Sequence, residues 1–182
     1  MKIRWLIALA ALLGASCRTK QNSALVVTKV VLGEISGTSC KYDPGADEFD
    51  FANIDPAANS GGTMGVVLQN NLSDPTALNS LYRTNSATFH PHQVVADYEV
   101  IGGTTLTNQI IPVSGTQITS GGGTGPVLVP FFSPAATATL TGTIRVTFQV
   151  EGKLDDGSVM KSSQHEYIFV TCSTADCNST CL

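Results

Sequence analysis

Acidic side chains gather in one stretch of the chain that also contains proline and glycine. They are Asp43, Asp47, Glu48 and Asp50. Ca²⁺ is bound by six to eight oxygen atoms from carboxylates, carbonyls and water, so a loop of this composition is a candidate calcium site. The spacing does not match the EF-hand pattern. The alternative is a solvated acidic loop, in which case the protein has no cofactor.

Aromatic side chains offer a second kind of binding site. A carbohydrate or another small ligand would stack on flat rings if the long loops gather at one end of the fold. The candidates for this role are Tyr42, Phe49, Phe51 and Tyr82. Alternatively, the two phenylalanines pack onto the domain as part of its core.

The residue types that catalysis requires have no recognisable arrangement. The chain has no G-x-S-x-G motif, and His90, His92 and His165 lie in no hydrolase context. The first two histidines would face the same side of a strand, but no third metal ligand is fixed. The glycine-rich run 121–125 lacks the lysine of a phosphate-binding loop. We therefore expect a protein that is not an enzyme.

The N-terminal residues have the pattern of an export signal. Lys2 and Arg4 precede a nine-residue apolar run, which ends in the small residues 14–16. A run of nine residues cannot cross the hydrocarbon core of a membrane, which requires roughly 20 residues as a helix. Residues 1–16 therefore predict a signal peptide.

The segment Leu13-Gly14-Ala15-Ser16-Cys17 resembles the lipobox of bacterial lipoproteins, although Gly14 stands where that family prefers leucine. The resemblance implies that the signal is cut before Cys17 and that this cysteine carries acyl chains such as palmitate. It also implies sorting to the outer membrane, because Arg18 is not the aspartate that retains such proteins at the inner membrane. Residues 17–23 would then be the lipidated start and a short tether. The alternative is a periplasmic or secreted protein.

Four further cysteines fit an oxidising compartment: Cys40, Cys172, Cys177 and Cys181. An even number of cysteines in an exported chain predicts two disulfides. We favour bonds from Cys40 to Cys172 and from Cys177 to Cys181, and the other two pairings stay open. A zinc site is the less favoured reading, because the cysteine pairs that structural zinc sites use are missing.

Composition excludes two function classes. Only 13% of the 182 residues are charged and 42% are hydrophobic, which does not fit a disordered chain. Removing residues 1–16 takes away Lys2 and Arg4, so the formal net charge changes from −4 to −6. An acidic protein of this kind gains nothing from the field of a nucleic acid, so we expect no nucleic-acid partner.

Alternating apolar and polar residues indicate β-strands. The clearest alternation lies in 143–150, a turn follows at 155–157, and 159–171 runs back as the second strand of a hairpin. Further strands are predicted at 24–32, 65–68, 94–101, 106–113, 127–132 and 137–140. Long loops are predicted at 36–62 and 114–125, and one weak helix at 73–82.

Seven to nine strands predict an all-β domain over residues 24–172, followed by a cysteine-containing tail at 173–182. The expected architecture is an antiparallel β-sandwich, immunoglobulin-like in general arrangement, with a closed β-barrel as the alternative. The chain resembles in type the small β-rich envelope lipoproteins of Gram-negative bacteria, which carry no established activity. That resemblance implies a membrane-anchored protein with a structural or protein-binding role, and leaves its envelope partner and its oligomeric state open. A carbohydrate-binding or small-ligand-binding module, dependent on calcium or not, is the alternative.

Overall fold

The computed structural model describes residues 24–36, 39–48, 51–58, 61–73 and 87–172. The strands of this part are β1 (Leu25–Val31), β2 (Glu34–Ser36), β3 (Ser39–Lys41), β4 (Phe51–Ile54), β5 (Gly62–Asn70), β6 (Phe89–Val100), β7 (Thr105–Pro112), β8 (Ser114–Gly115), β9 (Gly123–Phe132), β10 (Thr143–Leu154), β11 (Val159–Lys161) and β12 (His165–Thr171). Two short helical segments are η2 (Pro56–Ala58) and α2 (Pro134–Thr137). Four of these twelve strands have two or three residues, which explains why the sequence predicted fewer.

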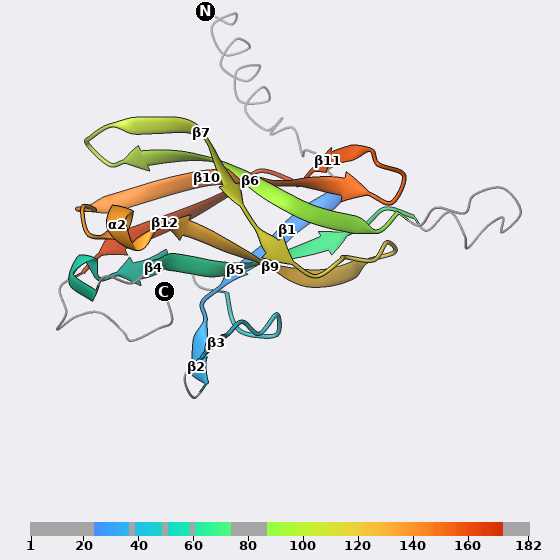
Figure 1. The fold of residues 1–182 in the computed structure, drawn as a ribbon, viewed down its shortest axis with the longest axis horizontal. Helices are drawn as coiled ribbons and strands as arrows, with labels where there is room; N and C mark the ends of the chain where they lie inside the picture. The colour runs from blue at the N-terminus through green and yellow to red at the C-terminus, as the bar shows by residue number, and fades with distance from the viewer. Residues whose placement is uncertain (1–23, 37–38, 49–50, 59–60, 74–86, 173–182) are drawn as a thin grey trace, which may run out of the picture.

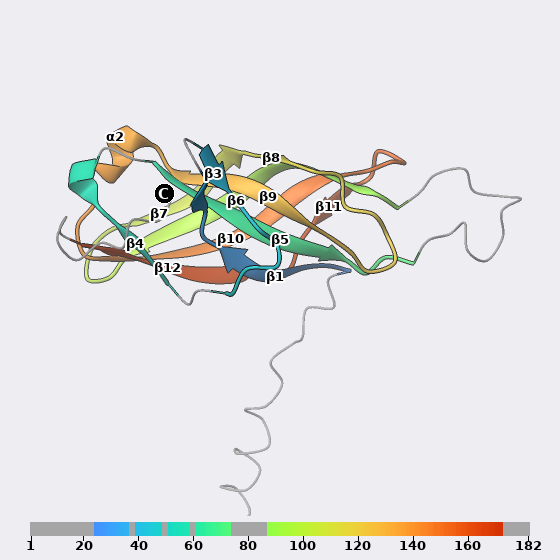
Figure 2. The same ribbon diagram turned by 90° about the horizontal axis from the view of Figure 1, so that it is seen from below.

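Ten of the twelve strands form two open sheets that pack face to face, and β2 and β3 form a separate two-stranded sheet (Figure 1). A four-stranded sheet has the order β1-β5-β9-β8, and a six-stranded sheet has the order β4-β12-β10-β6-β7 with β11 beside β10. Figure 2 shows the two layers from a second direction. The predicted β-sandwich is therefore confirmed, and neither sheet closes into a barrel within the described residues.

Strand β10 is the centre of the larger sheet, and its sequence explains its place. Its buried residues alternate with partly exposed ones from Ile144 to Val150, as predicted. It pairs in antiparallel register with β6 on one side and β12 on the other. The turn between β10 and β11 contains Gly157 at a φ of 82°, a backbone conformation that glycine adopts readily.

The predicted loop at 36–62 is wrong in part, because it contains regular structure on both sides of residues 42–48. It includes most of the β2–β3 hairpin, strand β4 and the 3-10 segment η2. Strand β4 pairs with β12 in parallel, and it buries Ala52 and Ile54 at the edge of the larger sheet. A four-residue strand with two buried side chains is too short to show a period in the sequence.

The predicted loop at 114–125 is also wrong. Strand β8 lies at its start, Ile118 forms an isolated bridge with Phe89, and β9 begins at Gly123. A Cβ atom on Gly123 would lie 2.2 Å from Oγ1 of Thr119. Gly123 therefore allows two segments of the chain to approach closely. Glycines with this role and glycines in a loop look the same in the sequence, so the strand was not predicted.

Residues 137–140 do not form the predicted strand. Ser133 caps α2, because its Oγ accepts a hydrogen bond from the backbone N–H of Ala136 at 3.2 Å. Pro134 occupies the first turn, where it costs no hydrogen bond. The weak helix predicted at 73–82 lies, beyond Ser73, outside the described residues.

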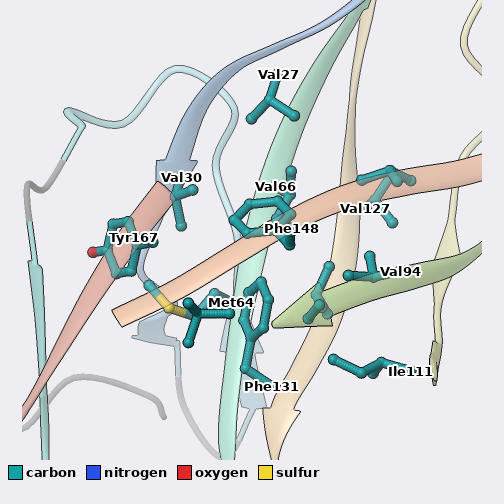
Figure 3. Close-up of a cluster of buried hydrophobic side chains, with 14 of the residues drawn as sticks. Val27, Val30, Met64, Val66, Val94, Ile111, Val127, Phe131, Phe148 and Tyr167 are labelled. Atoms are coloured by element: carbon teal, nitrogen blue, oxygen red, sulfur yellow. The ribbon is translucent and has the colours of Figure 1, made fainter. Parts of the chain in front are cut away.

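The core lies between the two sheets (Figure 3). Side chains from β1, β5 and β9 meet those from β6, β10 and β12 there. Aromatic rings occupy one part of it, where the rings of Phe131 and Phe148 lie 5.0 Å apart and those of Phe132 and Phe169 lie 4.9 Å apart, both edge to face. Among the described residues, only Asn70, Thr137 and Ser162 are polar and buried. The centre of the domain is therefore almost wholly apolar.

Candidate functional site

Strand β7 exposes large apolar side chains at the edge of the larger sheet. The exposed fractions of Leu106 and Ile110 are 58% and 67%, and Ile111 is the strand's one buried residue. No strand in the described part of the chain pairs with the outer side of β7. Large exposed apolar side chains on an unpaired sheet edge are a feature that soluble proteins usually avoid.

A groove of about 390 Å³ lies beside this edge. It is bounded by β7, by the end of β9, by the start of β10 and by α2 with the residues that follow the helix. None of its fourteen lining residues carries a charge. Most of them are apolar, and these include Leu106, Ile110, Ile111, Phe131, Phe132, Leu140 and Ile144. Both its volume and its lining are typical of a binding site for an uncharged, apolar group.

Tyr98 fixes one wall of the groove. Its hydroxyl donates a hydrogen bond to the backbone oxygen of Phe131 at 2.7 Å, and its ring lies edge to face with that of Phe132 at 5.4 Å. Burial raises the pKa of Tyr98 far above its ordinary value. The hydroxyl therefore stays protonated and links β6 of one sheet to β9 of the other.

Helix α2 forms the opposite wall. Its cap at Ser133 sets its direction, and the backbone N–H of Leu140 donates to the backbone oxygen of Thr137 at 3.1 Å just after its end. Ser133 and Thr139 also line the groove. Both hydroxyls bond to the backbone of Ala136, since Ser133 Oγ accepts from its N–H and Thr139 Oγ1 donates to its oxygen at 2.9 Å.

The hairpin of β6 and β7 has an irregular register. Its turn contains Gly102 at a φ of 80°. The register shifts between Ala96 and Tyr98, and the backbone N–H of Asn108 donates to Oδ1 of Asp97 at 2.7 Å. Asn108 has a φ of 53°, which is uncommon for a residue other than glycine. The bulge lies between Leu106 and Gln109, both of which line the groove.

The predicted acidic loop is packed against the outer face of the smaller sheet. We call residues 42–48 the strap. The Tyr42 hydroxyl donates to the backbone oxygen of Thr63 at 3.1 Å, and Nζ of Lys29 donates to the backbone oxygen of Ala46. Val31 is fully buried although it does not belong to the central core cluster, because the strap side of the sheet is covered.

The strap does not assemble its acidic residues into a metal site. Asp43, Asp47 and Glu48 are exposed, and Oδ1 of Asp43 accepts a hydrogen bond from the backbone N–H of Gly45 at 2.8 Å. No group of three or more potential metal ligands exists in the described ranges. Asp50, the fourth predicted ligand, lies outside them.

The predicted stacking residues have different surroundings. The ring of Tyr42 packs at Gly65, where an added Cβ would lie 3.2 Å from Tyr42 Cδ1. Phe51 is half exposed on β4. Phe49 and Tyr82 lie outside the described residues. Tyr42 therefore serves packing, and Phe51 is the one aromatic candidate with a ring that the structure shows to be exposed.

Two of the cysteines lie in the described part of the chain. Cys172 follows β12, its backbone N–H donates to the backbone oxygen of Ile54 at 3.0 Å, and its side chain is disulfide-bonded. Cys40 lies on β3 opposite Ile35. Cys17, Cys177 and Cys181 lie outside the described residues, so the pairing stays a prediction.

The three histidines do not come together. Nε2 of His90 pairs with Oδ1 of Asp155 at 2.6 Å, and His92 is exposed on the same strand. The ring of His165 packs against Phe148 at 5.5 Å between centroids. Burial lowers the pKa of His165, partly opposed by the carboxylates of Glu48 and Glu166. These positions favour structural roles.

Sequence reasoning did not find the groove. Residues 106–113 were predicted as a strand, but the sequence does not show that this strand lies at an edge, where its apolar residues stay exposed. The one available signal is that Leu106, Ile110 and Ile111 do not follow a strict alternation, which is the mark of a bulge.

No family model matches the chain, and no curated protein matches it in sequence. No helix in the described segments is long and apolar enough to cross a membrane.

Proposed function

We propose that this chain is an exported, lipid-anchored envelope protein without catalytic activity, which binds another protein through the groove beside β7. The observation that carries the binding role is the exposure of Leu106 and Ile110 at the mouth of an uncharged groove. Apolar side chains left in water at the edge of a hollow are typical of an interaction surface.

The anchor is proposed from the sequence. Cys17 follows a signal-like segment, and acyl chains on this residue would hold the protein at the membrane, since each buried methylene group contributes about 0.8 kcal/mol. Two disulfides from the four other cysteines accompany this proposal. The disulfide bond of Cys172 supports an oxidising compartment.

Metabolic labelling tests the anchor. The full chain is expressed in a Gram-negative host that is fed an alkyne analogue of palmitate, and membranes are separated by density. We expect label on the wild type in the outer-membrane fraction and none on a Cys17→Ala variant. A soluble wild-type product that keeps residues 1–16 in its mass spectrum would refute the proposal.

Carbohydrate binding remains the alternative function. The exposed ring of Phe51 supports it, whereas the packed ring of Tyr42 does not. Binding to a glycan array that Phe51→Ala abolishes would favour this alternative over protein binding.

A further inference from the structure

We infer that the partner of the groove is an extended, uncharged peptide segment that adds to the sheet as a new strand along β7. This inference rests on the proposed function and names the partner's chemistry. Its first support is geometric. Strand β7 is an edge strand. In an antiparallel pair, every second residue has its backbone N–H and C=O directed away from the neighbouring strand, so these groups of β7 point away from β6. An added strand would satisfy those groups, and its alternate side chains would enter the groove.

Charge defines the segment. The groove has no charged lining residue, although the protein as a whole is acidic. A carboxylate or ammonium group that entered it would lose water and find no opposite charge, which is costly. The polar side chains around the groove include Thr104, Gln109, Ser133 and Thr139, and the last three already bond to the chain's own backbone. The groove therefore suits a peptide with small apolar side chains and neutral polar ones.

The position of the anchored end argues against the bilayer as the occupant. Leu25, the first residue of β1, pairs with Asn70 of β5. Asn70 pairs in turn with Gly123, the first residue of β9. The groove lies at the other end of β9, a ten-residue strand that spans about 30 Å. Figure 1 shows β1 beginning near β11, while α2 lies at the far end of the sandwich. The proposed lipid on Cys17 is eight residues before Leu25, a separation of at most about 28 Å, so it would attach at the end of the sandwich opposite the groove.

A second copy of the chain is the competing occupant, because two β7 edges could pair antiparallel across a two-fold axis. Self-association through the groove would therefore contradict the peptide as its partner.

A binding measurement on the anchored full chain tests the inference. The protein is reconstituted in neutral phosphatidylcholine liposomes, and the probe is a fluorescein-labelled peptide of seven residues that alternates threonine with valine or leucine. Two companion peptides carry either aspartate at the apolar positions or N-methyl groups along one backbone edge. We expect saturable binding of the first peptide and at least tenfold weaker binding of both companions.

Matched variants locate the binding. The double variant Leu106→Asp with Ile110→Asp should weaken binding at least tenfold. Val159→Asp, which alters a residue of 65% exposure outside the groove, should not. Circular dichroism checks that all variants are folded. We expect them to fold, because the substituted side chains are exposed.

Several outcomes would overturn the inference. They are absence of saturable binding to the wild type, equal binding of the aspartate peptide, binding that the double variant retains, or self-association through the groove in analytical ultracentrifugation. Success of palmitate labelling with failure of peptide binding would refute this inference and leave the anchor intact.

Discussion

At the residue scale, Gly152 occupies a position of β10 where a side chain would not fit. A Cβ atom there would lie 2.2 Å from the backbone oxygen of His90 and 2.6 Å from Cζ of Phe89. The register between β10 and β6 shifts at this point. The glycine therefore lets the buried ring of Phe89 lie directly against the neighbouring strand.

Titration of His165 should affect stability near neutral pH. Burial lowers its pKa below the ordinary value of about 6.5, so the folded protein binds fewer protons than the unfolded chain just below that pH. The free energy of unfolding should therefore fall as the pH decreases from 7.5 through 6.5 to the folded-state pKa. Urea unfolding at half-unit intervals between pH 7.5 and 5.0 measures this slope.

The variant His165→Gln should have a smaller slope in this window, because the titrating group is gone. His92→Gln is the control for removal of an exposed imidazole. An unchanged slope in His165→Gln would show that other groups cause the acid sensitivity.

Glu151 acts at lower pH, because its hydrogen bond with Lys161 lowers its pKa and this stabilisation is lost only as the pH falls below about 4.5.

At the element scale, the strap and the groove lie on different surfaces and have different consequences. The strap covers apolar side chains on the outer face of the smaller sheet, whereas the β7 edge leaves its apolar side chains exposed. The first arrangement contributes to stability. The second provides a surface for a partner.

Tyr42 should contribute most of the strap's stabilisation. Tyr42→Ala removes the hydrogen bond to Thr63 and the ring that packs at Gly65, and we expect a loss of about 2 kcal/mol in the free energy of unfolding. Phe51→Ala, at a half-exposed ring, should cost less than half as much. Guanidinium unfolding of both variants makes the comparison, and a Tyr42→Ala protein as stable as the wild type would show that the strap is dispensable.

At the scale of the whole molecule, the stabilisation from the disulfide of Cys172 depends on which cysteine is its partner. A bond to Cys40 would close a loop of roughly 130 residues, and by chain entropy such a bond contributes about 4 to 5 kcal/mol. A bond to Cys177 or Cys181 would close a short loop and contribute much less.

Reduction should therefore lower the free energy of unfolding by up to about 5 kcal/mol if Cys40 is the partner. Thermal melting with and without a phosphine reductant measures the change, and Cys40→Ala should reproduce it. Mass spectrometry of unreduced peptides identifies the partner directly. A peptide that links Cys172 to Cys177 or Cys181 would contradict the favoured pairing.

The sequence by itself determined the strands with a strong period, and with them the sandwich. Ile144, Val146, Phe148 and Val150 alternate with polar residues, and a strand with one apolar face must bury that face against a second layer. Local pattern carries this information because it depends on residues two positions apart. The short strands β2, β4 and β8 have too few residues for a period, and for that reason they were missed.

Only the tertiary structure decided which apolar residues are buried and which stay in water. Leu106 and Ile110 have the side chains of a core, yet they are exposed because β7 is the last strand of its sheet. Strand order depends on contacts between segments far apart in the chain, so no local pattern specifies it. The acidic strap illustrates the same principle, since its packing on β1 and β5 depends on residues tens of positions away in sequence.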